Sequence, residues 1–270
     1  MNRNNKFSLK GKIAIVTGAL GLIGQKHCFA LNEAGAHVIV ADLDRQKCVA
    51  FAEYQLESSM GHYIDVCNKE SIYGLLEDVL TRFGKVDILV NNAAVNDMFE
   101  DPKAASEQSK FENYPVELWQ KSLDVNLTGV FLCSQVIGSQ MVKQENGSII
   151  NIGSTYGINA PNQDLYKDID GSQAFYKPPA YPVTKAGVIM LGKYLAAYWG
   201  QYGIRVNTLS PGGVQNGQAD FFIKNYSKKT PLGRMAEPDD YQGALVFLAS
   251  DASAYMTGAN LVVDGGWTCW

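Results

Sequence analysis

The most constraining feature of this sequence is its alternation between short apolar runs and longer stretches with apolar residues at helical spacing. Seven short runs are predicted to be strands: Lys12–Thr17, His37–Ala41, Gly61–Ile64, Val86–Val90, Ser148–Ile152, Arg205–Leu209 and Asn260–Val263. Strands joined by crossover helices form right-handed βαβ units and a parallel sheet with both faces covered. The sequence therefore predicts an α/β fold with a doubly wound parallel sheet of about seven strands.

The stretches between these runs have the apolar spacing of helices. The clearest are Ser71–Phe83, Pro115–Val142, Tyr181–Tyr202 and Pro238–Ala249. A hydrophobic share of 46% and a charged share of 19% are ordinary for a globular protein. Because we find no internal repeat, low-complexity tract or linker, we expect residues 1–270 to form a single domain with helices on both faces of the sheet.

Composition and charge exclude several classes of protein. The net charge of -4 gives no general attraction to nucleic acid or to an anionic membrane. The five cysteines are scattered without a C-x-x-C pair, and the three histidines show no ligand spacing, so neither a disulfide framework nor a metal site is expected. The polar N-terminus and the lack of a long apolar run predict no signal peptide and no membrane span, which favours a cytoplasmic protein.

A glycine-rich turn, TGALGLIG at 17–24, follows the first predicted strand and opens a helix. Gly18 allows the tight turn, Gly21 lets the backbone approach a pyrophosphate, and Gly24 lets helix and strand pack closely. The helix N-terminus offers N–H groups and a partial positive charge to the phosphates. This arrangement predicts a Rossmann-type dinucleotide site.

The second predicted strand leads to Asp42, 18 residues beyond Gly24. A carboxylate at this place can accept hydrogen bonds from the adenosine ribose hydroxyls and would repel a 2′-phosphate. The predicted cofactor is therefore NAD rather than NADP. Arg45 keeps the NADP alternative open, although no basic residue lies within the glycine turn.

Two polar stretches stand outside the alternation of strands and helices. Asn96–Asn113 follows the fourth predicted strand, and Asn159–Pro179 follows the fifth; both contain Pro, Asn and Asp as breakers. In open α/β sheets, ligands bind beyond the carboxyl ends of the strands, where both stretches must lie. We expect a substrate rim from residues 96–113, 154–180 and 212–234, with plain surface insertions as the alternative.

Taken together, these motifs resemble the short-chain dehydrogenase/reductase family over roughly residues 11–266. The motifs that carry the resemblance, in the family's order, are TGALGLIG, Asp42, Asp65-Val66, Asn91-Asn92-Ala93-Ala94, Asn126, Ser154, Tyr181-x-x-x-Lys185 and Pro211-Gly212. The resemblance implies a set of residues that hold the dinucleotide: Gly18, Leu20, Gly21, Leu22, Ile23, Gly24, Asp42, Asp65, Val66, Asn92, Ala93, Ala94, Tyr181, Lys185, Pro211, Gly212 and Val214.

The chain resembles the compact, single-domain branch of that family, with three departures. Its glycines fall as G-x-x-G-x-x-G, and Ser154 and Tyr181 lie far apart along the chain; both features are closer to the longer sugar-nucleotide branch. Asn216 stands where a threonine often meets the nicotinamide carboxamide. The stretch after Lys185 (186–270) is too short for the separate substrate domain of the long branch, which favours the compact one.

The predicted catalytic group centres on Tyr181 and Lys185, one turn apart near the start of a predicted helix, so that their side chains share a face. A free phenol has a pKa of about 10, which a nearby ammonium and an oxidised nicotinamide lower. The resemblance makes Tyr181 the acid/base, with Lys185 also bound to the nicotinamide ribose. The resemblance also implies that Ser154 binds the substrate oxygen and that Asn126 holds a water that links Lys185 to solvent. Singly, each residue has an ordinary structural explanation; the combination carries the prediction.

Polar side chains on the predicted rim point to the substrate class. Asn96, Tyr156 and Asn162 are candidates for substrate contact and favour a polyol, a sugar or a sugar derivative. The expected reaction is reversible oxidation of a secondary alcohol to a ketone, with surface-glycan biosynthesis as one setting. The alternatives are a sugar-nucleotide epimerase or dehydratase with tightly bound NAD, a 3-oxoacyl reductase, and a non-catalytic cofactor-binding scaffold.

The expected partners are a small-molecule substrate and further copies of the chain. Family members of this length form homotetramers or homodimers, as the resemblance implies. The ending Trp267–Trp270 is apolar for a free tail, so we expect it at a subunit contact.

Overall fold

The computed structural model describes residues 5–96, 106–173 and 175–270, and in them one parallel sheet of seven strands. The strands are β1 (Ile13–Thr17), β2 (His37–Asp42), β3 (Met60–Tyr63), β4 (Ile88–Asn91), β5 (Gly147–Ile152), β6 (Ile204–Pro211) and β7 (Asn260–Val263). Their order is β3-β2-β1-β4-β5-β6-β7. The predicted sheet is confirmed, with strand ends displaced by one or two residues.

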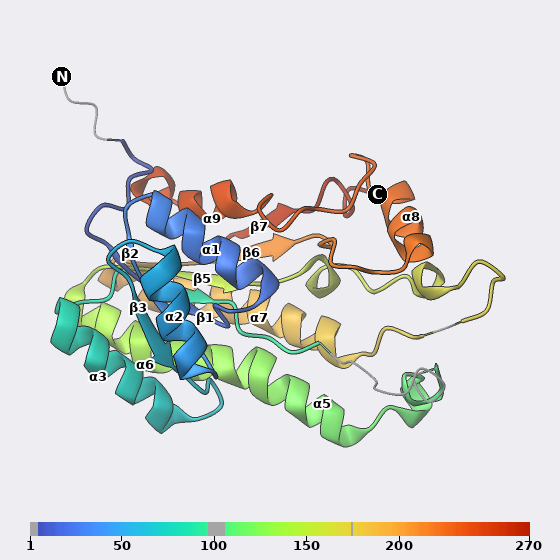
Figure 1. The fold of residues 1–270 in the computed structure, drawn as a ribbon, viewed down its shortest axis with the longest axis horizontal. Coiled ribbons are helices and arrows are strands. Elements are labelled where there is room, and N and C mark those ends of the chain that lie inside the picture. The colour runs from blue at the N-terminus through green and yellow to red at the C-terminus, as the bar shows by residue number, and fades with distance from the viewer. Residues whose placement is uncertain (1–4, 97–105, 174) are drawn as a thin grey trace.

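Helices cover both faces of this sheet, and each face has its own apolar core (Figure 1). On one face lie α1 (Leu22–Glu33), α2 (Arg45–Gln55) and α9 (Gln242–Ala249). On the other lie α3 (Lys69–Phe83), α6 (Gly129–Gln144) and α7 (Ala180–Trp199). Along β1, Ile13 and Ile15 enter one core while Ala14 and Val16 enter the other. Burial on both sides explains why the strands read as unbroken apolar runs.

The strand order changes direction between β1 and β4, which are neighbours in the sheet although β2 and β3 lie between them in the chain. The connections from β1 and from β4 therefore leave the sheet toward opposite faces. This opens a crevice beyond the carboxyl ends of these strands, where doubly wound sheets bind ligands.

Polar side chains and a glycine set the boundaries of the helices that pack on the sheet. Asp44 caps α2 by accepting a hydrogen bond from the Lys47 N–H at 3.1 Å, and Asn68 caps α3 in the same way through the Ser71 N–H at 3.1 Å. Gly84, in the left-handed conformation at φ 76°, ends α3. These caps satisfy N–H and C=O groups that the helices leave unpaired.

The predicted helix Pro115–Val142 is helical along its length but contains a π turn. It consists of α5 (Val116–Leu123), the π turn Asp124–Thr128 and α6. A π turn adds one residue to a helical turn, so the apolar spacing on either side stays nearly helical. The π turn therefore cannot be recognised from the spacing of apolar residues. By length and composition Val116–Gln144 could also cross a membrane, but half of its most apolar window is buried inside the fold. Packing against α3 and α7 accounts for its buried apolar side chains.

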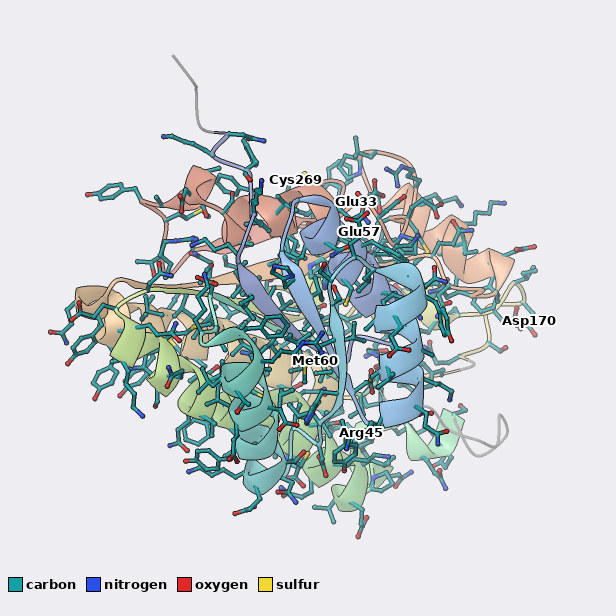
Figure 2. All side chains as sticks on the ribbon, turned by 60° about the vertical axis from the view of Figure 1, so that its left-hand side comes forward. Glu33, Arg45, Glu57, Met60, Asp170 and Cys269 are labelled. Atoms are coloured by element: carbon teal, nitrogen blue, oxygen red, sulfur yellow. The ribbon has the colours of Figure 1, made fainter. Side chains whose placement is uncertain are left out.

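The polar stretch Asn159–Pro179 leaves the sheet after β5. It contains a short 3₁₀ helix, Gln163–Tyr166, and an antiparallel bridge between Lys167 and Gln173. Its tip at Asp170 points away from the sheet (Figure 2). The stretch lies near α8 (Asp220–Lys228), at the end of the molecule where the C-terminus also lies (Figure 1).

Candidate active site

The glycine turn after β1 is shaped for a close approach of backbone and ligand. Gly18 has φ +61°, and a Cβ on it would lie 2.7 Å from the Ala93 Cα atom. A Cβ on Gly24 would lie 2.2 Å from the Gly18 carbonyl oxygen, so the close packing of α1 on the turn requires glycine there. Because the N-cap of α1 is Gly21, the capping residue has no side chain to occupy the first N–H groups of the helix. They are placed to bind an anion.

Asp42 lies at the end of β2, beside this turn. Its Oδ2 atom accepts a hydrogen bond from the Leu20 N–H at 2.9 Å, and its Oδ1 atom accepts one from the Leu43 N–H at 2.7 Å. Two backbone donors thus orient the carboxylate at the mouth of the turn. It has the place and chemistry of a ribose-binding group.

Asn92 and Thr17 join the turn to the end of β4. The Asn92 Nδ2 atom donates to the carbonyls of Thr17 at 2.9 Å and Gly18 at 2.8 Å. The Thr17 hydroxyl accepts hydrogen bonds from the N–H groups of Asn92 and Ala93, each at 3.1 Å. The Asn92 amide therefore holds the turn in shape, a role that its position in the family motif does not reveal.

These segments enclose a cleft of about 930 Å³. The predicted dinucleotide residues that line it are Gly18, Leu20, Gly21, Leu22, Ile23, Gly24, Asp42, Asp65, Val66, Asn92, Ala93, Ala94 and Tyr181. Further lining residues that were not assigned to the cofactor from the sequence include Leu43, Val95 and Lys121, and Asn216 also lines the cleft. With an anion-binding helix end, an oriented carboxylate and this volume, the cleft fits a dinucleotide.

Tyr181 and Ser154 come together from two elements. Tyr181 is the second residue of α7, and Ser154 follows β5. Burial raises the pKa of the Tyr181 phenol above its ordinary value, and a hydrogen bond with Ser154 partly offsets this effect. The Ser154 hydroxyl also accepts a hydrogen bond from the Tyr156 N–H at 3.1 Å, which fixes the serine at the start of a 3₁₀ turn.

Lys185 lies on the same face of α7 as Tyr181, as expected from their spacing. Its Nζ atom is 5.6 Å from the centre of the Tyr181 ring and donates a hydrogen bond of 2.6 Å to the carbonyl oxygen of Ile152, at the end of β5. Burial lowers the pKa of Lys185 to about 8. The group is therefore still mostly protonated at neutral pH, beside the phenol.

Asn126 sits in the middle of the π turn and is fully buried. Its side-chain amide accepts a hydrogen bond from the Val95 N–H at 2.7 Å and donates one to the Val95 carbonyl at 2.9 Å. A further hydrogen bond of 3.4 Å joins it to the hydroxyl of Thr184, the residue before Lys185. Asn126 thus connects the helix after β4 to the catalytic helix. Its predicted water relay stays a prediction.

A second cavity, of about 480 Å³, adjoins the dinucleotide cleft, and Tyr181 lines both. The predicted nicotinamide-end residues Pro211, Gly212 and Val214 line this second cavity, as do Ser154, Asn96 and Tyr156. The expected rim residues from 154–180 and 212–234 therefore do meet here. Of the rim stretch 96–113, residues 97–105 lie outside the described part of the chain.

Two features of this rim differ from what the sequence indicates. Asn162 does not line the cavity, because its side-chain oxygen caps the 3₁₀ helix Gln163–Tyr166 through the Asp164 N–H at 2.9 Å. The rim is also less polar than expected, since aromatic side chains from the 3₁₀ turn after β5, from the insertion and from α8 line the site. They are Tyr156, Tyr166, Phe175, Phe221, Phe222 and Tyr226.

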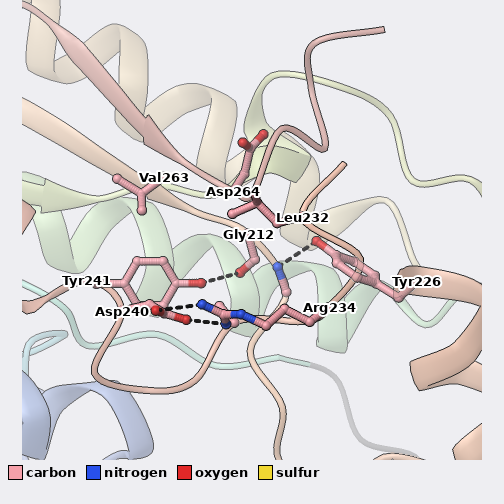
Figure 3. Close-up of a pocket in the computed structure, with 11 residues that line it drawn as sticks. Gly212, Tyr226, Leu232, Arg234, Asp240, Tyr241, Val263 and Asp264 are labelled. Carbon is pink, nitrogen blue, oxygen red and sulfur yellow. Dashed lines mark hydrogen bonds and ion pairs between the residues drawn. The ribbon is translucent and has the colours of Figure 1, made fainter. Parts of the chain in front are cut away.

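The loop that starts at Pro211 is held from two sides by tyrosines (Figure 3). The Tyr241 hydroxyl donates a hydrogen bond to the Gly212 carbonyl at 3.2 Å, and the Gly213 N–H donates one to the Tyr226 hydroxyl at 2.6 Å. The aromatic ring of Tyr226 in turn stacks on Trp267, with ring centres 4.5 Å apart. The backbone predicted to meet the nicotinamide is therefore fixed by α8, α9 and the C-terminal segment.

Comparison with known proteins now identifies the family. The model described as "Enoyl-(Acyl carrier protein) reductase" matches residues 18–268, nearly the whole chain. The chain belongs to the short-chain dehydrogenase/reductase family. Members of this family are oxidoreductases that use a nicotinamide dinucleotide, which agrees with the shape of the cleft.

Several relatives of this short-chain dehydrogenase/reductase are named for small polyhydroxy compounds. D-threitol dehydrogenase of Mycolicibacterium smegmatis is 35% identical, over 97% of this chain and 95% of its own. A short-chain dehydrogenase of Leptospira borgpetersenii with bound NAD⁺ is 33% identical with a TM-score of 0.85, covering 99% of this chain and 97% of its own. A gluconate 5-dehydrogenase of Burkholderia cenocepacia, in complex with NADP and tartrate, is 30% identical with a TM-score of 0.82, covering 98% of both chains.

A lysine that the sequence motifs do not mark also lies at the site of this short-chain dehydrogenase/reductase. Lys177, from the insertion, is buried and lines the second cavity, with its ammonium 4.8 Å from the centre of the Tyr181 ring. A lysine in a polar loop is usually solvated, so Lys177 is not an obvious candidate from its surroundings in the sequence. Its position four residues before Tyr181, mirroring Lys185 four residues after, was the available signal.

Proposed function

We propose that the protein is an NAD-dependent oxidoreductase that interconverts a secondary alcohol and a ketone on a polyol, a sugar or a sugar-derived substrate. The observation that carries this proposal is the position of Tyr181, which borders both the dinucleotide cleft and the adjoining cavity. A phenol at that boundary can exchange a proton with a substrate hydroxyl whose carbon faces the cofactor side.

In the proposed reaction, the residues around Tyr181 have different roles. A nicotinamide bound in the cleft supplies the acceptor for the hydride that leaves the alcohol carbon. Tyr181, as phenolate, takes the hydroxyl proton, and Ser154 donates a hydrogen bond to the substrate oxygen. Because burial raises the pKa of Tyr181, the positive charge of Lys185 is needed to favour the phenolate. In the reverse direction Tyr181 returns the proton to the alkoxide oxygen.

The preference for NAD rests on Asp42. Its carboxylate is held at the mouth of the glycine turn by the Leu20 and Leu43 N–H groups, where a 2′-phosphate would meet a negative charge. Solved relatives bind NAD⁺ in one case and NADP in another, so the family alone leaves the choice open. The local charge supports NAD.

The substrate class is supported by the relatives and by the cavity. One relative is named for D-threitol and another for gluconate, both small polyhydroxy compounds. The cavity combines aromatic walls, which can cover the C–H faces of such a molecule, with a polar end at Ser154, Asn96 and Lys177, which can bind its oxygens.

We further propose that the protein works as a homotetramer or homodimer in the cytoplasm. Helices α6 and α7 expose large apolar side chains that a subunit contact would cover, among them Phe131, Met190, Tyr194 and Tyr198. The five cysteines are free, as in a reducing compartment.

A panel of polyols, aldonic acids and simple secondary alcohols, assayed with NAD and with NADP, tests the proposed function. We expect reduction of NAD with at least one polyol or sugar acid, and a kcat/KM for NAD at least about tenfold above that for NADP. The absence of net dinucleotide reduction across the panel would contradict the alcohol–ketone reaction, and a preference for NADP would contradict the role of Asp42.

A further inference from the structure

Lys177 is a buried lysine beside Tyr181 that the mechanism above does not use. Its side chain is 8% exposed, and its backbone is held on both sides by one glutamine. The Gln163 side chain accepts a hydrogen bond from the Lys177 N–H at 2.8 Å and donates one to the Lys177 carbonyl at 3.1 Å. Gln173 in turn donates to the Gln163 carbonyl at 3.0 Å. The insertion is therefore built to place this lysine.

The two lysines near the phenol point to different places. The Lys185 ammonium reaches the Ile152 carbonyl at the end of the sheet. The Lys177 ammonium lies over the Tyr181 ring, donates a hydrogen bond to the Asn96 side-chain oxygen and lines the substrate cavity. Lys177 thus stands on the substrate side of Tyr181, where Lys185 does not reach.

The aromatic walls of the cavity do not distinguish a polyol from a plain alcohol. Phe175, Phe221 and Phe222 offer apolar surface that suits either molecule. A buried site that is arranged to bind a substrate oxygen, in contrast, rejects an analogue that lacks this oxygen, because its polar groups then lose a partner. Lys177 and Asn96 form such a polar site beside the reacting group.

We propose that Lys177, with Asn96, binds the oxygen substituent on the carbon next to the reacting carbon. Lys177 is then a specificity-determining residue that selects polyhydroxy or hydroxy-acid substrates over plain secondary alcohols. This inference rests on the proposed function and assigns a role to the insertion 159–179, which delivers the lysine.

Butane-2,3-diol and butan-2-ol test the proposal, because they differ by one hydroxyl on the adjacent carbon. We expect the wild type to prefer the diol in kcat/KM, and Lys177→Met to lower this preference at least about tenfold. Lys167→Met is the matched control, since Lys167 lies on the same insertion but forms an exposed ion pair with Asp164 at 2.6 Å. It should keep the preference of the wild type.

Other results would contradict the proposed role of Lys177 or the proposed function. If Lys177→Met keeps the preference for the diol, Lys177 does not contact the substrate. If kcat/KM falls equally for both alcohols and the pH profile shifts, Lys177 instead acts on the protonation of Tyr181. If thermal unfolding shows that Lys177→Met does not fold, Lys177→Gln carries the same expectation. A wild type that oxidises no alcohol with either dinucleotide contradicts the proposed function itself, whereas turnover with an unchanged preference contradicts only this inference.

Discussion

Tyr181 borders two cavities and is the residue on which the proposed chemistry depends. Its phenol is buried, which by itself disfavours the charged form. A hydrogen bond with Ser154 lowers the pKa of the phenol, and the ammonium groups of Lys185 and Lys177 lie 5.6 and 4.8 Å from the centre of its ring. The site therefore counters the cost of burial with nearby donors and positive charge.

Replacing Tyr181 by phenylalanine removes the proton acceptor and keeps the ring. We expect Tyr181→Phe to lower kcat about 10²–10⁴-fold, the usual contribution of general acid–base catalysis, while the Kd for the dinucleotide changes little. Steady-state kinetics and fluorescence titration measure the two quantities. Tyr54→Phe, at an exposed position of α2, is the control and should behave as the wild type. Near-normal turnover in Tyr181→Phe would disprove the assignment.

The role of a side chain was predictable where a local sequence motif fixes its position on the backbone. The glycine turn, Asp42 and the Tyr181–Lys185 pair follow from local spacing. Asn162 caps its own 3₁₀ helix and does not line the cavity, which its place in the polar stretch did not indicate. Lys177 was missed because its burial depends on Gln163, fourteen residues away.

At the scale of elements, the loop after β6 depends on helices that are distant in sequence. Tyr241, beside α9, and Tyr226, on α8, hold the backbone at Gly212 and Gly213 from opposite sides (Figure 3). Tyr241 lines the small cavity behind the loop and is absent from the linings of both the dinucleotide cleft and the substrate cavity. It is a positioning residue.

Removing the Tyr241 hydroxyl tests this positioning. Tyr241→Phe deletes the hydrogen bond to the Gly212 carbonyl and leaves the ring in place, so we expect the Kd for NAD to rise about fivefold, the equivalent of about 1 kcal/mol. The KM for the alcohol should change less than the KM for NAD. Tyr202→Phe, on the exposed turn after α7, is the control. A loss of thermal stability with unchanged NAD affinity would show that the hydrogen bond serves the fold alone.

The boundaries of elements were predictable where burial repeats along the chain. Strands such as β1 and β5 are buried at every residue, which produces a plain apolar run. The π turn at Asn126 was not predictable, because it is stabilised by hydrogen bonds from Asn126 to Val95 on another segment. Local spacing carries no trace of such a contact.

At the scale of the whole molecule, part of the C-terminal segment packs within its own chain, although we expected it at a subunit contact. Trp267 is buried and stacks on Tyr226 of the same chain, so its apolar character needs no subunit contact. Trp270 in contrast is 76% exposed. The expectation of a subunit contact therefore narrows to the last two residues.

Truncation after Thr268 separates these roles. It removes Cys269 and Trp270 and leaves Trp267 on Tyr226, so we expect a smaller oligomer by light scattering with little change in the melting temperature at matched protein concentration. Trp267→Ala serves as the contrast, because loss of a buried tryptophan costs about 3–5 kcal/mol and should lower the melting temperature clearly. An unchanged mass after truncation would place the subunit contact elsewhere.

The sequence by itself determined the order of strands and helices, the glycine turn with its carboxylate, and the spacing of Tyr181 and Lys185. These features depend on neighbours along the chain, through backbone geometry and repeated burial. Only the tertiary structure decided that Tyr181 borders two cavities, that aromatic side chains cover the rim, and that Lys177 is buried at the phenol. Such facts depend on contacts between segments far apart in sequence, which the packing of the whole chain creates.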